Sequence, residues 1–593
     1  CSAPDTRSLN DVLEQCISKG TVSSADFSEN DSVRFALTYK NENDLVTKLR
    51  SISKFVSSGH DLSPLENQGI YISTDKSADE KLAFCFPGQG THYISMGRFM
   101  YDSNMTFRNI IDEVDVLAKK EMDFDLVGHI YGDSENKEIE KNLGTLTGAQ
   151  VSLFAIEVAL AKALEEKGIT ADVLVGHSFG EISALAFAGV WDIPTAFKVV
   201  KARIEAAEVA KKAAPFPLGM MSINCSEEKR DKLLSFAGKD LILTNVNAPG
   251  RYIFAGELEL VKKTVDLAES FGLEARVLPI GSAFHSKFME PAKEKYYSLL
   301  SKLSCSNPTY KIMSTVTGDY IPETLNSEKI AKHLSLQLTT KLNLPREIEK
   351  LNSDGINHFL EVGPGWSMTK MISEILKDKK FKAVPTLHPK IGDSEVFARA
   401  IAFLTLSGHT SGQSQKRRIS DFITPDMLNF IKTSSPEVFE KLTELHAQFV
   451  RGSQPCRGET PFSPSPASPA SPASQTSQTS PTSPTSQNSS FDWEARIKQE
   501  LAKMTGYPLD MLESELDLEA DLGIDSIQRA ELWVNLSREF SIPEDARPKA
   551  PVRTITGLAK AFSEASCRGE TPFSPSPASP ASQTSQTSPT SPT

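Results

Sequence analysis

Two short apolar runs along the chain each end in a glycine-rich turn. Lys81–Phe86 is apolar after its first residue and meets Pro-Gly-Gln-Gly at 87–90, and Asp172–Gly176 leads into a second glycine turn. Runs of this length bounded by glycine are typical of buried strands. Apolar residues recur at helical spacing over Thr147–Leu164, and a second helical stretch follows at Glu181–Gly189. The pattern predicts an α/β core.

A different alternation lies between residues 219 and 280. The segments GMMSIN, LILTNVN, RYIFAGE and ARVLPI have strand-like alternation, whereas Ser226–Phe236 and Leu258–Phe271 have helical spacing. The resulting β-α-β-β-α-β order predicts a small ferredoxin-like subdomain inserted into the larger α/β part. We expect the active site in the cleft between the two.

The second glycine turn, residues 176–180, has the pattern G-x-S-x-G between a predicted strand and a predicted helix. In this context Ser178 is held above the sheet at a helix N-terminus, where the Phe179 N–H faces a developing oxyanion. A structural turn serine would show the same pattern. A nucleophilic serine needs a base. His177 is next to the serine and would point elsewhere. His285 lies on a loop after an apolar run, where it could enter a cleft, although a lone histidine is more often structural.

Two low-complexity segments divide the chain. Cys567–Thr593 repeats Cys456–Thr485 with three residues deleted, and the two copies start 567 − 456 = 111 residues apart. Ser, Pro, Ala, Thr and Gln cannot build a core, so we expect disordered linkers around a small domain in a tandem array. The chain begins at Cys1 and ends inside the second copy, so we expect an excised piece of a longer protein with at least one more copy of the small domain.

Composition narrows the classes of function. The chain has 593 residues and a net charge of 64 − 76 = −12, which disfavours a duplex nucleic-acid binder. The seven cysteines form no CxxC pair, so we expect a reducing, cytoplasmic setting and no zinc or other metal site. The best membrane candidate, Val151–Leu164, is short for a span and carries Glu157 and Lys162. We therefore expect no membrane partner.

Six motifs fall in a fixed order along the large block: FPGQG at 86–90, GHSFG at 176–180, Arg203, NVNAPG at 245–250, AFH at 283–285 and EVGPG at 361–365. Together they resemble the malonyl-CoA:acyl-carrier-protein transacylase (acyltransferase) domain of fatty acid and polyketide synthases. The resemblance implies that Ser178 attacks an acyl-CoA thioester, that His285 is its base, and that Gln89 and Phe179 hold the oxyanion. It also places Asn343 near the group that orients the histidine. His177, Asn247 and Phe284 would line the substrate pocket.

Arg203 indicates the substrate class. A guanidinium in an apolar pocket pairs bidentately with a carboxylate, which malonyl has and acetyl lacks. Most arginines on helices lie at the protein surface. The position of Arg203 among the ordered family motifs implies that it lies in the pocket instead. In this family, a Phe directly before the histidine, here Phe284, implies selectivity for malonyl over methylmalonyl. Malonyl-selective members often carry His at the position of Ser282, so Ser282 departs from their pattern.

The small block predicts helices at Trp493–Gly506, from the LGIDSI motif at 522–527 through Glu539, and at Ile555–Ser563. LGIDSI resembles the phosphopantetheine attachment motif of acyl carrier proteins, which implies that Ser526 carries 4′-phosphopantetheine. A run of acidic residues with no basic residue among them lies before Ser526. It is interpreted either as a solvated face or as a docking face for partner domains. Its members are Asp510, Glu513, Glu515, Asp517, Glu519, Asp521 and Asp525.

The expected fold is an α/β hydrolase-like acyltransferase core with an inserted ferredoxin-like subdomain, an α/β adaptor before it, and a Pro/Ser/Ala linker and a four-helix-bundle carrier after it. GIDSI with tandem carriers most resembles iterative polyketide or polyunsaturated-fatty-acid synthases, which implies an upstream ketosynthase and a phosphopantetheinyl transferase as partners. The expected bounds are 1–80 for a ketosynthase-to-acyltransferase adaptor, 81–390 for the acyltransferase with its insert at 219–280, 391–455 for a helical region, 456–490 for a linker, 491–566 for the carrier and 567–593 for the repeated linker.

The expected activity is transfer of malonyl from malonyl-CoA, through a seryl intermediate, to the phosphopantetheine thiol of tethered carriers. Two alternatives are an acyl-thioester hydrolase on the same fold and a non-catalytic carrier scaffold. Arg203 disfavours the hydrolase, and the presence of both Ser178 and His285 disfavours the scaffold.

Overall fold

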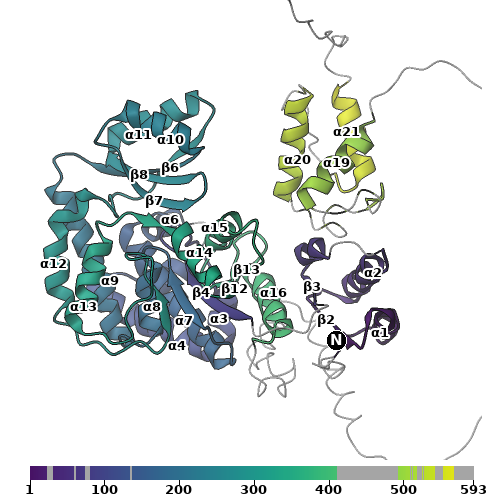
Figure 1. Cartoon of the computed structure of the whole chain (residues 1–593), viewed down its shortest axis with the longest axis horizontal. Helices are drawn as coiled ribbons and strands as arrows, with labels where there is room; N and C mark the ends of the chain where they lie inside the picture. The colour runs from purple at the N-terminus through teal and green to yellow at the C-terminus, as the bar shows by residue number, and fades with distance from the viewer. Residues whose placement is uncertain are drawn as a thin grey trace, which may run out of the picture. The chain divides into compact units, whose positions relative to one another are not determined.

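A computed structural model of the chain divides into two compact units, one of residues 1–49 and 69–463 and the other of 50–68 and 464–593 (Figure 1). The structure describes residues 1–22, 31–58, 62–73, 80–133, 136–409, 492–505, 507, 509, 512–516, 518, 522, 524, 526–540, 542 and 552–566. Both low-complexity segments lie outside the described residues.

A five-stranded parallel sheet forms the centre of the first unit, in the order β10-β5-β4-β12-β13. The central strands β4 and β5 are buried on both faces, which explains their nearly continuous apolar sequences. Leu82, Phe84 and Phe86 of β4 face one core cluster, and the alternating Ala83 and Cys85 face the other. The strands are β4 (Lys81–Phe86), β5 (Val173–Gly176), β10 (Lys311–Met313), β12 (Ile356–Glu361) and β13 (Lys382–Pro385).

The register of this sheet brings three motif turns to one edge. Phe86 pairs with Gly176, and Glu361 pairs with Cys85, so β4, β5 and β12 end together. The glycine turns that follow these strands therefore meet at the carboxyl edge of the sheet, where open α/β folds place their ligands.

Helices cover both faces of the sheet. α14 and α15 share the core cluster with Ala83 and Cys85, and α7 and α8 share the opposite one. The helices of this part are α3 (Arg98–Ser103), α4 (Met105–Met122), α5 (Leu126–Tyr131), α6 (Lys137–Leu143), α7 (Leu146–Glu166), α8 (Gly180–Phe187), α9 (Ile193–Ala213), η3 (Lys287–Met289), α12 (Glu290–Leu300), α13 (Ser327–Gln337), α14 (Leu344–Ser353), α15 (Ser367–Ile375) and α16 (Asp393–Leu406).

α7 is longer than the apolar run that predicts it. Within the described residues it alone is long and apolar enough to cross a membrane by length and composition, yet 83% of its most apolar window is buried inside the protein. A core helix of an α/β layer has the same composition, because it packs on the sheet and on neighbouring helices at once.

A second sheet, ordered β11-β7-β8-β6-β9, is built from the segment between Ser178 and His285. Its first four strands along the chain are joined in the predicted β-α-β-β-α-β order, and α11 packs on one face (Figure 1). The fifth, β11, comes from beyond His285 and was not expected. The elements are β6 (Leu218–Asn224), α10 (Glu227–Ala237), β7 (Ile242–Ala248), β8 (Arg251–Glu257), α11 (Leu258–Ser270), β9 (Glu274–Leu278) and β11 (Leu342–Asn343).

The N-terminal segment contributes a small antiparallel sheet, ordered β1-β2-β3. α16 packs on β2 and β3 through contacts that include Tyr71 and Phe403. The elements are β1 (Ser2–Ala3), α1 (Thr6–Lys19), β2 (Val33–Leu37), α2 (Glu42–Ser58), η2 (Ser63–Gln68) and β3 (Ile70–Ser73).

The second unit contains the predicted carrier block. The described residues of this block form three helices, α19 (Trp493–Thr505), α20 (Ser526–Glu539) and α21 (Ile555–Ser566). Phe562 stacks on Trp533 with ring centroids 4.1 Å apart and on Trp493 at 5.2 Å, so aromatic packing joins the three helices. A fourth helix of the expected bundle is not among the described residues.

Candidate active site

Ser178 sits in the sharp turn between β5 and α8. Its φ is 56°, a left-handed backbone that is uncommon for a residue with a side chain. Flanking glycines make the turn possible. A Cβ on Gly176 would lie 2.2 Å from the Glu181 nitrogen, and one on Gly180 would lie 2.2 Å from the Phe86 oxygen. The turn therefore requires glycine at both positions, as the motif predicts.

The fold brings His285 to this serine from 107 residues away. The Ser178 Oγ and the His285 Nε2 are 2.6 Å apart. His285 also has a left-handed backbone, with φ 61°, and its N–H donates to the Leu338 carbonyl at 2.7 Å. The nucleophile and the base are thus both presented from strained positions that tertiary contacts hold in place.

The group that orients His285 is the backbone carbonyl of Gln337, which lies 2.9 Å from the His285 Nδ1. The assignment of this role to Asn343 is wrong. Asn343 belongs to β11, where it pairs with Val246 of the second sheet. α13 ends at Gln337, so carbonyls at this end of the helix lack helical partners and are available to the histidine. Because a carbonyl only accepts, Nδ1 carries the proton and Nε2 is free to accept the serine hydroxyl.

His285 is a neutral base in this setting. Burial and, after it, the nearby positive charge of Arg203 together lower its pKa to about 3, although the hydrogen bond to Gln337 acts in the opposite direction. An imidazole that stays neutral at physiological pH is ready to take the proton of the serine hydroxyl.

Arg203, on α9, is 1% exposed. Its guanidinium lies 4.1 Å from the centre of the Phe284 ring and 5.6 Å from that of Phe179. Among the described residues its Nε and Nη1 have no hydrogen-bond partner. Burial lowers the pKa of Arg203 to about 10, so the group remains charged at neutral pH. A buried cation with unused donors is costly to the free protein and suits an anionic ligand.

The other predicted residues lie around this centre. Gln89 follows β4, and its Oε1 accepts from the Gln150 Nε2 at 3.4 Å. Phe179 is the N-cap residue of α8, at the positive end of that helix. The His177 Nε2 and the Asn247 Oδ1 are 3.1 Å apart, so the His177 ring contacts β7 of the second sheet.

Sequence reasoning missed three residues of this site. Gln337 acts through a backbone carbonyl, which leaves no trace in the identity of a residue. Gln150 and Tyr296 lie on helices and carry buried polar atoms without a partner among the described residues. Tyr296 lies near enough to Arg203 to influence the pKa of that guanidinium, and α12, which carries Tyr296, packs on α9. A polar residue on the apolar face of a helix is the signal that could have found them.

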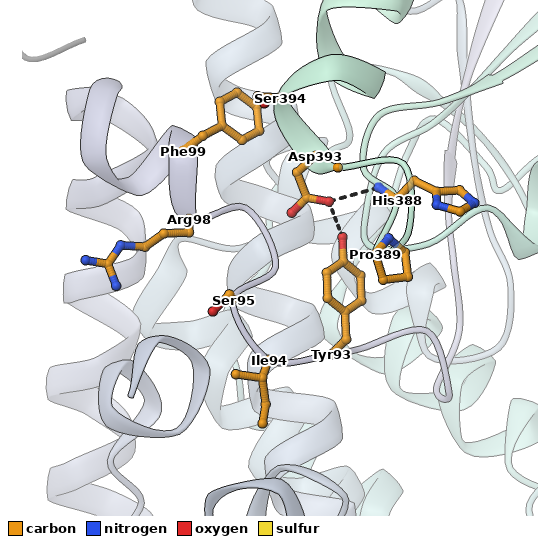
Figure 2. A pocket seen from close by; sticks show the side chains of 10 residues that line it. Tyr93, Ile94, Ser95, Arg98, Phe99, His388, Pro389, Asp393 and Ser394 are labelled. Atoms are coloured by element: carbon orange, nitrogen blue, oxygen red, sulfur yellow. Dashed lines mark hydrogen bonds between the residues drawn. The ribbon is translucent and has the colours of Figure 1, made fainter. Parts of the chain in front are cut away.

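A pocket of about 400 Å³ lies elsewhere, and none of the predicted site residues lines it (Figure 2). Its polar groups are engaged with one another. Asp393 accepts from the Tyr93 hydroxyl, from the Gly97 N–H at 2.7 Å and from the His388 N–H at 2.9 Å. These bonds tie the start of α16 to the loop before α3, a structural role.

Ser526 is the first residue of α20, a 14-residue helix. A helix N-terminus favours a phosphate group on its first turn, so the position fits the ester phosphate of 4′-phosphopantetheine. Most of the acidic residues before it lie outside the described residues.

Comparisons with known proteins agree with this geometry. A family model described as "Acyl transferase domain" matches residues 83–414, more than half of the chain, and one described as "Phosphopantetheine attachment site" matches 495–547. A malonyl CoA-acyl carrier protein transacylase of Bacillus subtilis (strain 168) is 29% identical over 318 residues, 52% of this chain and 94% of that protein. Its counterpart in Staphylococcus aureus (strain MSSA476) is 29% identical over 322 residues, 53% of this chain and 99% of that protein.

Among solved structures, the acyltransferase domain from the second module of the salinomycin polyketide synthase is similar, with a TM-score of 0.54 and 25% identity. The match covers 70% of this chain and 95% of that one.

Proposed function

The chain belongs to the acyl transferase domain family, and we propose that it transfers malonyl from malonyl-CoA to the phosphopantetheine thiol of an acyl carrier domain. The observation that carries the proposal is Arg203, a buried guanidinium with unused donors beside a serine–histidine pair. Only an acyl group with a free carboxylate pairs with it, which is what separates malonyl from acetyl.

The first half of the reaction acylates Ser178. The His285 Nε2 takes the hydroxyl proton as the Oγ bonds to the thioester carbon, and the carbonyl oxygen becomes an oxyanion held by Gln89 and the Phe179 N–H. The intermediate collapses as the carbon–sulfur bond breaks, and His285 returns the proton to the departing CoA sulfur. The product is a malonyl ester on Ser178.

In the second half His285 accepts the proton of an incoming thiol as its sulfur bonds to the ester carbon, and passes that proton to the Ser178 Oγ as the ester bond breaks, which leaves malonyl as a thioester. When bound through Ser526, 4′-phosphopantetheine supplies that thiol. The chain's own contribution is to present Ser526 at a helix N-terminus and to tether it, which raises the local carrier concentration to about millimolar.

The finer architecture is part of the same proposal. The strand order and connections of the second sheet support a ferredoxin-like subdomain. We further propose that 1–80 is a ketosynthase-to-acyltransferase adaptor, that the carrier is a four-helix bundle in a tandem array, and that the whole belongs to an iterative polyketide or polyunsaturated-fatty-acid synthase. An upstream ketosynthase and a phosphopantetheinyl transferase are the partners this implies.

Intact mass spectrometry after incubation with malonyl-CoA or acetyl-CoA tests the function. We expect a malonyl adduct on the wild type, none on Ser178→Ala, and little acetyl adduct. Release of CoA without any adduct would indicate the hydrolase instead, and no reaction would indicate a scaffold. Equal labelling by both substrates would contradict the role of Arg203.

A further inference from the structure

We propose that Glu181 and His333 form a buried pair that positions Gln337, and through it both Ser178 and His285, for acyl transfer. The inference rests on the proposed function and adds three positioning residues to it. None of them touches the reacting atoms through its side chain.

Glu181 is a carboxylate in the first turn of α8, fully buried directly behind the nucleophile turn. Three side chains reach it. The His333 Nε2 lies 2.7 Å from its Oε1, and the Thr315 hydroxyl and the Gln337 amide both donate to its Oε2. A buried carboxylate persists when it is surrounded by donors in this way. Its nearest titratable neighbours are His333, Tyr296 and Glu347, and Glu347 is paired with Arg346.

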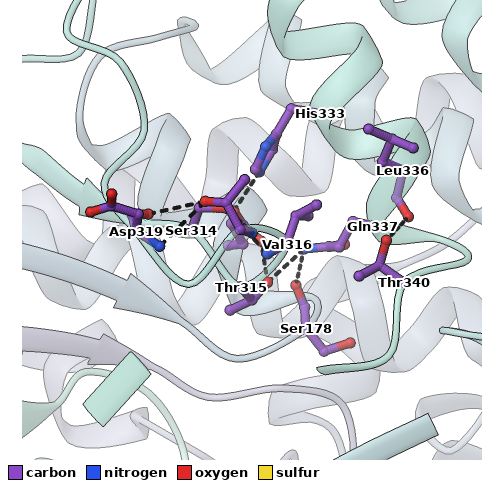
Figure 3. Close-up of polar contacts among 11 residues, drawn as sticks. Ser178, Ser314, Thr315, Val316, Asp319, His333, Leu336, Gln337 and Thr340 are labelled. Carbon is purple, nitrogen blue, oxygen red and sulfur yellow. Dashed lines mark hydrogen bonds and ion pairs between the residues drawn. The ribbon is translucent and has the colours of Figure 1, made fainter. Parts of the chain in front are cut away.

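Gln337 joins this carboxylate to the catalytic pair. Its Nε2 donates to the Ser178 carbonyl at 3.0 Å and to Glu181, and its own carbonyl accepts from the His285 Nδ1. Figure 3 shows Gln337 directed at Thr315 and at the Ser178 backbone, with His333 approaching the same cluster from one turn earlier in α13. Because the Ser178 carbonyl and the Glu181 carboxylate are both acceptors, the amide nitrogen of Gln337 must face them.

The path is continuous over the whole site. His333 binds Glu181, Glu181 binds Gln337, and Gln337 holds Ser178 at its carbonyl and His285 at its ring. Ser178 and His285 both have positive φ, so neither keeps its position by local preference. A shift of Gln337 would displace the nucleophile and the base together.

The consequence is an effect on chemistry and not on substrate binding. Removing the His333 imidazole takes away one of the three side chains that contact Glu181 and loosens the segment 336–338 that carries the Gln337 carbonyl. A misplacement of about 1 Å in such a site costs on the order of 100-fold in rate. We expect His333→Ala to lower kcat about 10- to 100-fold and to leave the KM for malonyl-CoA within about 2-fold, because Arg203 is untouched.

The experiment compares wild type, His333→Ala, His333→Gln and Ser335→Ala in the full chain, with kcat referred to the fraction of Ser178 that a serine-directed phosphonate labels. His333→Gln restores a donor toward Glu181 and should recover most of the rate. Ser335→Ala is the control on the same helix, since Ser335 is 3% exposed and its hydroxyl forms no hydrogen bond with any of the five residues of the path. It should behave as wild type.

An unchanged kcat per labelled site in His333→Ala would overturn the inference, as would a loss that His333→Gln fails to recover. If His333→Ala does not fold, Thr315→Val removes another donor to Glu181 at equal volume and should lower kcat several-fold, and an unchanged kcat there would overturn the inference equally. The proposed function fails separately, if the wild type itself forms no malonyl adduct.

Discussion

Replacing Arg203 by alanine tests the link between a buried charge and substrate choice. In the free protein the guanidinium is 1% exposed, packed on Phe284 at 4.1 Å, with two nitrogens unpartnered among the described residues. A malonyl carboxylate would accept hydrogen bonds from these nitrogens, whereas an acetyl group would leave the guanidinium unpaired. Arg203→Ala reverses both situations, because malonyl then brings an uncompensated charge into an apolar pocket.

The size of the effect follows from burial. Removing one partner of a buried ion pair costs about 3–5 kcal/mol. At about 1.4 kcal/mol per factor of ten, the lower figure corresponds to about a 100-fold loss of kcat/KM for malonyl-CoA. Acetyl-CoA should gain or stay level, so the malonyl-to-acetyl ratio should fall by about 100- to 1000-fold.

The assay is competition between the two thioesters, with the Ser178 adducts resolved by mass. Arg203→Lys is the matched variant. It keeps the charge but not the planar fork, so its selectivity should fall between those of wild type and Arg203→Ala. An equal loss for both substrates in Arg203→Ala would refute the reasoning, since it would mean that the arginine supports the fold and not the carboxylate.

Three further predictions concern the same site. Because His285 must be neutral to accept a proton and burial lowers its pKa to about 3, kcat/KM should remain level as pH falls through 6.5 and decline only at more acid pH; an acid limb centred at 6.5 in the pH–rate profile would contradict this. Gly180→Ala should lower the free energy of unfolding by about 3 kcal/mol, because its Cβ meets the Phe86 oxygen at 2.2 Å, whereas Gly281→Ala, with no atom within 4 Å, should leave the Tm unchanged. Tyr296→Phe removes a buried hydroxyl without a partner among the described residues and should raise the free energy of unfolding by about 1 kcal/mol; a lower Tm in thermal melting would show that the hydroxyl is bonded.

Much of the local structure was predictable because it depends on short-range sterics. The strand at Lys81–Phe86 and the turn at 176–180 follow from apolar runs and from glycines that no larger residue could replace. The β-α-β-β-α-β order between β6 and β9 follows from the switch between alternating and helical spacing. β11 was missed, because two residues of strand carry no periodicity.

The orienting group of His285 shows where side-chain reasoning fails. Asn343 was placed near the backbone carbonyl expected to orient the histidine, but the hydrogen bond goes to the carbonyl of Gln337 at the end of α13. Every residue has such a carbonyl, so only its position in space distinguishes the one that acts. Glu181 and His333 escaped notice for a related reason, because they are 152 residues apart and meet only in the folded chain.

The amino-acid sequence by itself determined the nucleophile turn, the two motif-bearing strands, the candidate base and arginine, and the placement of Ser526 at the start of a helix, because each is a local pattern of size, flexibility and polarity. Only the tertiary structure decided that His285 reaches Ser178, that Gln337 holds them both, and that two nitrogens of the buried Arg203 have no hydrogen-bond partner among the described residues. Those facts depend on how distant segments pack, and hydrogen bonds across such distances leave no periodic signal along the chain.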